Sequence, residues 1–456
     1  MAITGSSSEP DRTRLSQSEL QLVIHRHVAF LRRQPGGVRA NLKLRDLSHL
    51  DLSGLDLSDA DLSGAKLFSA RLSGCNLSGA NLYAADLRLA NLEKADLRRA
   101  DLRGACLRGA VLNEALMVET DLRDGTIMHV RKDGRIDAHE FEPIPQQTEL
   151  SCATVLAADM TRAKVSNAFV MQTDLTDCIL RGTKFVRANL TNANLTGCDL
   201  KGADLREANL TGAKLQGAVL TGAELNQTRF TGAMLVGVIM DDATRRSADL
   251  RDAVMARRPE ECGLDLTDML AEHAVWVDSG GKEGIRADLS SLDLSGADLS
   301  GANLSAALLH CATLRGAKLV GAVLAMADLS LADLREADLS GADLRGASLE
   351  RTTLTGARAR KADIGPVHIQ GTSGRLWSAN LTRARLDGAD LSGAVLYRAA
   401  LLQASLVGAT LQQADLREAR LTGADLSEAR CSGVDLAGAD LAEARTVSAV
   451  GLPPLR

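Results

Sequence analysis

The stretch that determines the fold is Ala60-Asp61-Leu62-Ser63-Gly64, which is followed directly by Ala65-Lys66-Leu67-Phe68-Ser69. Each five-residue unit contains a small residue, a polar residue, a leucine and two loosely chosen small or polar residues. The unit recurs along nearly the whole chain. This repetition has to be interpreted before any single residue is considered catalytic, because sequence repeats set the architecture of a protein.

A period of five residues fits neither the α-helical period of about 3.6 nor the strand alternation of 2. The chain must therefore bend once in every unit, so that short extended pieces joined by regular turns wind into a β-solenoid. If four units complete one square coil, residues twenty positions apart stack at about 4.8 Å, as neighbouring strands do. The leucine then points to the axis with the small residue beside it, and the other three positions face water.

The repeat resembles the motif A-(D/N)-L-x-x of the pentapeptide-repeat family. The resemblance implies an all-β solenoid, a right-handed quadrilateral β-helix. Phe185 and Phe230 occupy leucine positions, a replacement that the family accepts. The composition agrees, because a narrow shaft filled by leucine has little room for rings, and aromatic residues make up only 2% of the chain.

Two helices are expected in addition to the repeats. Ser16-Gln17-Ser18-Glu19 is a capping-box pattern, and the apolar spacing after it predicts an amphipathic helix over about 16–33. The same spacing predicts a second helix over 265–277. Each helix contains His-x-x-aromatic and precedes Gly-Gly and then Arg-Ala-(Asp/Asn)-Leu. We infer a duplicated module in which the helix caps the leucines and strand edges at the open end of a solenoid.

Three interruptions shift the register of the repeats, and the eight prolines lie at breaks or near the ends of the chain, where no ladder N–H is needed. In the first interruption, Asp133-Gly134 lies between β-compatible arms and predicts a hairpin. The predicted runs of axial residues are Leu42 to Ile127, Leu150 to about Met255, Leu289 to Ile369, and Leu381 to Leu441.

The predicted organisation is therefore two tandem modules. Its segments are a disordered leader at 1–15, a capping helix at 16–37, a first β-helix at 38–257 with an insert at 130–147, a linker with a second capping helix at 258–286, a second β-helix at 287–446 with a loop at 365–378, and a tail at 447–456.

Two vertical rows of outward side chains are expected, and the first supports four units per coil. One row contains alternating charges at twenty-residue spacing, namely Asp298, Lys318, Asp338 and Arg358, as cross-strand pairing would favour. The other stacks carboxylates and amides, and it can be read as a functional ladder or as a set of turn-capping side chains. We favour turn capping for this row, which consists of Asn41, Asp61, Asn81, Asp101 and Asp121.

The sequence contains few candidates for catalytic, metal-binding or cofactor-binding residues. The eight histidines (25, 27, 49, 129, 139, 273, 310 and 368) contain no H-x-x-x-H pair, and His273 is interpreted as a packing residue. Cys178 and Cys198 are expected to stack within disulfide reach, yet to remain free thiols. No nucleotide-binding or nucleophile motif has a usable context. We therefore predict a protein that is not an enzyme, with no catalytic, cofactor-binding or metal-binding residues and no cofactors.

A net charge of −5 and a pI of about 6.0 indicate neither a basic nucleic-acid patch nor a strongly acidic surface. No signal segment or membrane span is predicted, so a cytoplasmic, bacterial protein without direct nucleic-acid binding is expected. The function hypothesis is a structural or protein-interaction scaffold with an unknown protein partner. Its contact regions would be 130–147, 258–286 and 365–378.

The family resemblance implies an alternative, a DNA-mimicking protein that binds DNA gyrase and protects it from quinolones. Such members are generally acidic rods that dimerise through a C-terminal helix. This sequence shows no such helix. Arginines also interrupt its acidic faces, namely Arg88, Arg98, Arg103, Arg108, Arg417, Arg420 and Arg430.

Overall fold

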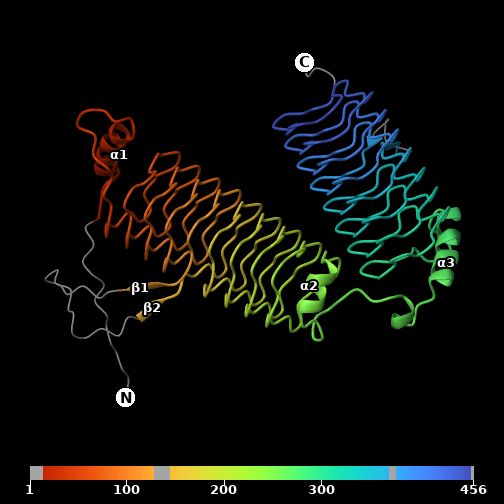
Figure 1. The fold of residues 1–456 in the computed structure, drawn as a ribbon, viewed down its shortest axis with the longest axis horizontal. Coiled ribbons are helices and arrows are strands. Elements are labelled where there is room, and N and C mark those ends of the chain that lie inside the picture. Colours follow the sequence, from red (N-terminus) through yellow and green to blue (C-terminus); the bar gives the residue numbers. More distant parts are fainter. Residues whose placement is uncertain (1–13, 128–143, 369–375, 453–456) are drawn as a thin grey trace. The chain divides into compact units, whose positions relative to one another are not determined.

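The computed structural model describes residues 14–127, 144–368 and 376–452. The chain divides into two compact units. Unit 1 comprises Met1–Met234 and Met240–Ala253, and unit 2 comprises Leu235–Ile239 and Val254–Arg456. Each unit is a stack of coils in which every five-residue repeat supplies one side (Figure 1).

The backbone of each repeat forms one ladder step and one turn. In the unit that contains Leu62, the Leu62 N–H donates to the Asn81 carbonyl at 2.8 Å in the next coil. The Ala65 N–H then closes a turn on the Leu62 carbonyl at 3.0 Å. Gly64, the third residue of this turn, has φ of 61°, as a type II turn requires. Parallel bridges link residues twenty positions apart, such as Asp61 with Asn81, so four units make one coil.

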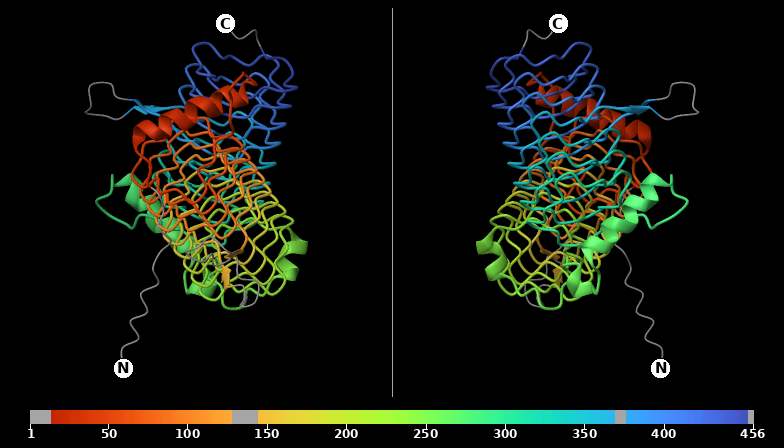
Figure 2. Two further views of the ribbon diagram at one scale, coloured as in Figure 1. Left: turned by 90° about the vertical axis from the view of Figure 1, so that its left-hand side faces the viewer. Right: turned by 90° about the vertical axis from the view of Figure 1, so that its right-hand side faces the viewer.

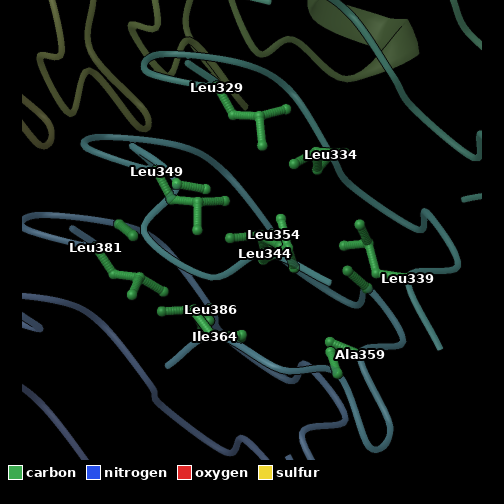
Figure 3. Packing of buried hydrophobic residues seen from close by; sticks show 14 of the residues in the cluster. Leu329, Leu334, Leu339, Leu344, Leu349, Leu354, Ala359, Ile364, Leu381 and Leu386 are labelled. Atoms are coloured by element: carbon green, nitrogen blue, oxygen red, sulfur yellow. The ribbon is translucent and has the colours of Figure 1, made fainter. Parts of the chain in front are cut away.

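The axial side chains fill the shaft. The axial leucines, at every fifth position from Leu42 to Leu112, are fully buried, and from Ala60 onward the residue two positions before each of them is a buried alanine or, at Cys75, a buried cysteine. Figure 3 shows the axial side chains of unit 2 pointing towards one another from successive coils. Phe185 and Phe230 occupy axial positions and are 0% and 2% exposed, which confirms the prediction for both.

The first insert interrupts unit 1 without ending its ladder. Cys106 bridges to Glu149, 43 residues away instead of 20, and the next three steps keep this offset. Leu150 therefore occupies the axial position above Leu107, and the prediction that Ile127 is axial was wrong. Ile127 instead ends strand β1 (Gly125–Ile127), which pairs antiparallel with β2 (Ile144–Gln146). The predicted hairpin at Asp133-Gly134 lies outside the described residues.

The second loop has the same construction in unit 2. Ser348 bridges to Asn380, 32 residues away, and the offset persists through Asp363 and Val395. Leu381 occupies the axial position that was predicted for Ile369, which lies outside the described residues. The chain leaves and re-enters the coil through two short antiparallel strands, β3 (Val367–His368) and β4 (Leu376–Trp377).

Two predicted ends of the repeat runs need correction. Helix α2 (Asp242–Ser247) interrupts the run after Leu150 before Met255, and one turn of the ladder resumes after it, where the Leu235 N–H donates to the Val254 carbonyl at 2.8 Å. Asp241 begins α2 by accepting from the Thr244 N–H at 2.7 Å, a capping signal that the sequence analysis missed. At the other end, the ladder continues beyond residue 446 to Val450, which bridges to Arg430. Backbone pairing needs no leucine, so the ladder of bridges continues past the last repeat that fits the sequence motif.

The remaining helices precede the two coil stacks. Helix α1 (Gln17–Leu31) begins with the capping box of Ser16 and Glu19. A 3-10 turn, η1 (Glu260–Cys262), precedes α3 (Leu266–Asp278), which Asp265 caps. Figures 1 and 2 show α1 beside the first coils of unit 1 and α3 beside the first coils of unit 2.

Candidate interaction surface

The polar second position of each repeat caps its own turn. Asp61 accepts from the Ser63 N–H at 3.0 Å, and Asp101 accepts from the Arg103 N–H at 3.1 Å. Asn41, Asn81 and Asp121 make the same contact with the N–H two residues later. All five side chains of this row lie in one ladder. Turn capping therefore accounts for the row, as the structural interpretation predicted.

Arginine neutralises many of these carboxylates. In Asp204-Leu205-Arg206, Arg206 donates from Nε to Oδ1 at 2.9 Å and from Nη2 to Oδ2 at 2.7 Å. This hydrogen-bonded pairing lowers the pKa of Asp204. The same fork occurs in eight further Asp-Leu-Arg tripeptides, those ending at Arg88, Arg98, Arg103, Arg123, Arg251, Arg335, Arg345 and Arg417.

The forks are a feature that the sequence analysis missed. The arginines were expected to interrupt the acidic faces, and the tripeptide Asp-Leu-Arg was the available signal that an arginine pairs with the aspartate two residues earlier. The leucine points inward, so the two polar side chains that flank it leave the wall together. Arg108 lacks an aspartate two residues earlier and pairs instead with Glu149 from the next coil at 2.5 Å. The walls therefore satisfy much of their own charge.

The alternating row in unit 2 has the predicted arrangement. Asp298 bridges to Lys318, and Asp338 bridges to Arg358, within one ladder. Lys318 Nζ lies 3.5 Å from Asp298, and Arg358 lies 3.9 Å from Asp338. These exposed pairs are worth at most about 1 kcal/mol each. They confirm four repeats per coil.

Some inward positions have threonine or cysteine in place of alanine. Thr183 donates to the Met160 carbonyl at 2.7 Å, and Thr120 donates in the same way to Leu97. Cys178 and Cys198 donate to the carbonyls of Val155 and Leu175, and all eight cysteines are free. The prediction of free thiols for this pair is confirmed. Their sulfhydryls act as buried donors.

A serine, a histidine and an aspartate meet in unit 2, yet in the wrong order for nucleophilic catalysis. Ser330 donates to Asp328 at 2.5 Å, and His310 Nδ1 lies 2.8 Å from the Ser330 hydroxyl. The serine proton is thus held by the carboxylate, so the hydroxyl accepts from His310. A nucleophilic serine must instead give its proton to the histidine. Ser340 with Asp338 shows that the same contact occurs in a repeat without histidine.

Across 14–127, 144–368 and 376–452, no group of three or more His, Cys, Asp or Glu side chains is placed to hold a metal ion. In that described part of the chain, no helix has the length and apolar character needed to cross a bilayer.

Histidine joins each long helix to its first coil. His27 of α1 is fully buried, its Nδ1 accepts from the Ala40 N–H at 3.1 Å, and its Nε2 lies 3.0 Å from the Ser58 carbonyl. His273 of α3 is also fully buried, and its Nδ1 accepts from the Ala287 N–H at 3.1 Å. His273 stacks on Trp276, which confirms its interpretation as a packing residue.

The base of the second loop exposes a large aromatic ring. Trp377 of β4 is 49% exposed, while its indole lies against the coil at Gly346. A side chain at residue 346 would approach Trp377 Cδ1 to 3.1 Å and Val367 Cγ1 to 2.8 Å, so the glycine makes room for the strand pair. Of the three predicted contact regions, 130–147 lies mostly outside the described residues, and α3 occupies much of 258–286.

The sequence profile of the pentapeptide repeats matches more than half of this chain. It matches in multiple copies at 38–74, 46–82, 75–114, 171–206, 203–242, 287–324, 327–364, 375–413 and 404–442. The chain therefore belongs to the pentapeptide-repeat family, whose members fold as right-handed quadrilateral β-helices. No curated protein matches the sequence significantly.

Solved structures of the same family share the repeat. The pentapeptide-repeat protein Rfr23 from the cyanobacterium Cyanothece 51142 is 25% identical over 30% of this chain and 88% of its own, with a TM-score of 0.23. HetL from Nostoc sp. strain PCC 7120 is 21% identical over 92% of both chains, with a TM-score of 0.13. QnrB1, a plasmid-mediated fluoroquinolone resistance protein, is 21% identical over 45% of this chain and 92% of its own, with a TM-score of 0.26.

Proposed function

We propose that this protein is a non-enzymatic scaffold that binds a protein partner where the strand pairs β1–β2 and β3–β4 leave its coils. The observation that carries the proposal is the exposed Trp377 at the base of the second loop. The leucine-filled shaft offers no concavity to a substrate, whereas enzyme sites are concave. The walls use their arginines to neutralise their own aspartates. The strand pair β3–β4 is therefore a place where a large aromatic side chain remains for a partner.

Trp377 has the properties of a binding anchor. Tryptophan is enriched among the few residues that dominate interface energetics. Its contact with the Gly346 coil holds the indole in place, so little side-chain entropy is lost when a partner covers the exposed half. The partner surface that fits an exposed indole is an apolar pocket with a hydrogen-bond acceptor for Nε1.

We also propose that the chain comprises two tandem modules and that α1 and α3 are their N-terminal caps. The duplicated contacts support this organisation. Val38 and Ile285 donate to Arg26 and Glu272 in the respective helices, and the histidine contacts repeat as well. Gly37 and Gly284 both lie directly against their helix backbones. A cap satisfies the strand edge that an open solenoid end would expose.

The test compares two deletions and one substitution in affinity capture from the source organism. Removing 125–147 or 366–377 restores the twenty-residue ladder step, because these segments contain the extra residues of each offset. Trp377→Ala removes the indole alone, and Met326→Ala, at an exposed wall position, is the matched control. We expect circular dichroism melts to stay unchanged for all variants.

A specific partner should be lost with Trp377→Ala and with deletion of 366–377, yet retained by Met326→Ala. If every variant recovers the same proteins as the parent chain, the strand pairs are not the binding surface. If deletion of 125–147 abolishes folding, that insert has a structural role instead of an interaction role.

The alternative function, gyrase binding by DNA mimicry, requires rows of unpaired negative charge. The nine Asp-Leu-Arg forks weaken it because they place a guanidinium on many of the carboxylates. A gyrase supercoiling assay with a quinolone distinguishes the two functions. The scaffold proposal predicts neither inhibition nor protection, whereas protection would establish the alternative.

A further inference from the structure

The two buried histidines repeat one local arrangement in both units. Each lies on the coil-facing side of its helix, three residues before an aromatic ring that stacks on it. The ring centroids are 6.0 Å apart for His27 and Phe30, and 5.6 Å apart for His273 and Trp276, with an interplanar angle of 14° in both pairs. The arginine before the contacted alanine also donates to a coil carbonyl, Arg39 to Asp59 and Arg286 to Ala306.

The hydrogen bonds fix the protonation state of both rings. Nδ1 accepts from a backbone N–H in each unit, so this nitrogen must be unprotonated. The ring proton of His27 is therefore on Nε2, from which it is donated to the Ser58 carbonyl. A second proton would place an Nδ1–H against the Ala40 or Ala287 N–H. Two donors cannot share a hydrogen bond, and a charged ring would be buried.

We propose that His27 and His273 are acid-sensitive latches: the neutral rings hold α1 and α3 against their first coils, and protonation of Nδ1 releases each helix. The same arrangement occurs twice on different helices. In both cases the histidine supplies the acceptor that a buried coil amide would otherwise lack.

The charged surroundings set the direction of the response. Burial is the largest cause that lowers the pKa of His27 from 6.5, and Arg39 lowers it further. The Ser58 carbonyl, Asp56 and Asp59 oppose this shift. Burial and Arg286 lower the pKa of His273, and only the Ser305 carbonyl opposes them.

The lowered pKa values decide at which pH the latches open. A histidine with a lowered pKa stabilises the fold fully above pH 6.5. That contribution is lost as the pH falls from 6.5 towards the folded pKa.

The two latches differ in one contact. His27 Nε2 lies 3.0 Å from the Ser58 carbonyl, whereas His273 Nε2 is buried without a hydrogen bond of ordinary length and angle, although the Ser305 carbonyl still raises its pKa. An unsatisfied buried donor weakens the contact that contains it. The histidine contact of α3 should therefore be weaker than that of α1.

Trp276 is a built-in reporter of the second latch. Trp377→Phe leaves Trp276 as the single tryptophan of the chain, stacked on His273. We expect its fluorescence, followed from pH 8 to pH 4.5, to change in one step with a midpoint below 6.5. His273→Asn in the same background keeps an acceptor for the Ala287 N–H without a titrating group, so its fluorescence should stay constant. A flat titration of the Trp377→Phe protein, or the same step in His273→Asn, would overturn the proposal.

Hydrogen exchange of the unmodified chain gives a second measurement that needs no variant. After correction for the intrinsic pH dependence of exchange, the segments around Ala287 and Ala40 should lose protection below pH 6.5. Leu329 in the middle of the ladder serves as the control and should keep its protection. Constant protection at both alanines, or equal loss at Leu329, would show that no latch opens separately from the coils.

Discussion

Arg335 grips Asp333 with two parallel hydrogen bonds, Nε to Oδ1 at 2.8 Å and Nη2 to Oδ2 at 2.6 Å, and both side chains are largely buried. Their exposed fractions are 18% and 2%, whereas the equivalent pair of Arg345 and Asp343 is 45% and 24% exposed. One chain thus contains the same fork in two environments. Because the two pairs have the same hydrogen-bond geometry, comparing their variants isolates the effect of burial on stability.

Arg335→Ala should destabilise unit 2 strongly, by about 3–5 kcal/mol, because it leaves the Asp333 carboxylate buried without its cation. Arg345→Ala should cost less than about 1 kcal/mol. Urea denaturation followed by circular dichroism measures both. The double variant Asp333→Asn with Arg335→Met removes both charges and should recover most of the loss. If it is as unstable as Arg335→Ala, lost arginine packing is responsible.

Glycine at the last position of a repeat should stabilise the coil. Gln227 has φ of 60° at an exposed turn position, a conformation that costs a residue with a Cβ about 1–2 kcal/mol. Gln227→Gly relieves this cost but gains unfolded-state entropy, so we expect a net stabilisation of up to about 1 kcal/mol. Asn226→Gly, one residue earlier, is the control and should destabilise by about 0.5–1 kcal/mol. Equal urea midpoints for both variants would show that the positive φ of Gln227 does not cost free energy.

Buried thiols should resist alkylation in the folded protein. Burial raises the pKa of Cys75 and of Cys311 to about 12, so almost no reactive thiolate forms at pH 8. Cys152 is exposed and should react first with iodoacetamide. Peptide mass spectrometry reads each site, and all eight cysteines should react in urea. Rapid modification of Cys75 without urea would indicate that the coil opens locally.

The pKa of Asp51 should be set mainly by the hydrogen bonds that its carboxylate accepts within its own turn. The Ser53 N–H is the largest cause that lowers its pKa to about 2, the Ser53 hydroxyl follows, and Arg71 contributes less. Carbon NMR of the carboxylate should therefore show a pKa that stays below 3.8 in Arg71→Ala. The stability from this carboxylate is present above pH 3.8 and is lost as the pH falls towards 2. A return to 3.8 in Arg71→Ala would instead make the ion pair the cause.

Much of the fold could be predicted because each repeat specifies its own geometry. Leu62 points inward, Asp61 caps the turn and Gly64 permits the positive φ, and all three act within one five-residue unit. The prediction of axial residues was wrong where the repeats, and with them this local information, ended. At Ile127 the repeat spacing continues into the insert, so only the pairing of Cys106 with Glu149 shows that Leu150 occupies the axial position.

The candidate surfaces were predictable only in part. The second loop was located from its glycines and its register shift, but the exposure of Trp377 depends on the pairing of β3 with β4 and on the space at Gly346. The partners of His273 were not predictable, because the Ala287 amide reaches the ring only when α3 lies against the first coil.

The sequence by itself determined the four-sided solenoid, the number of repeats per coil and the two long helices, because period and capping are local properties of the chain. The tertiary structure decided which side chains meet across coils and which are covered. It pairs Arg108 with Glu149 and covers Asp333 while Asp343 stays accessible. Arg108 and Glu149 come from different coils, and Asp333 and Asp343 occupy the same position of the motif, so these differences depend on what packs around each repeat and not on the motif.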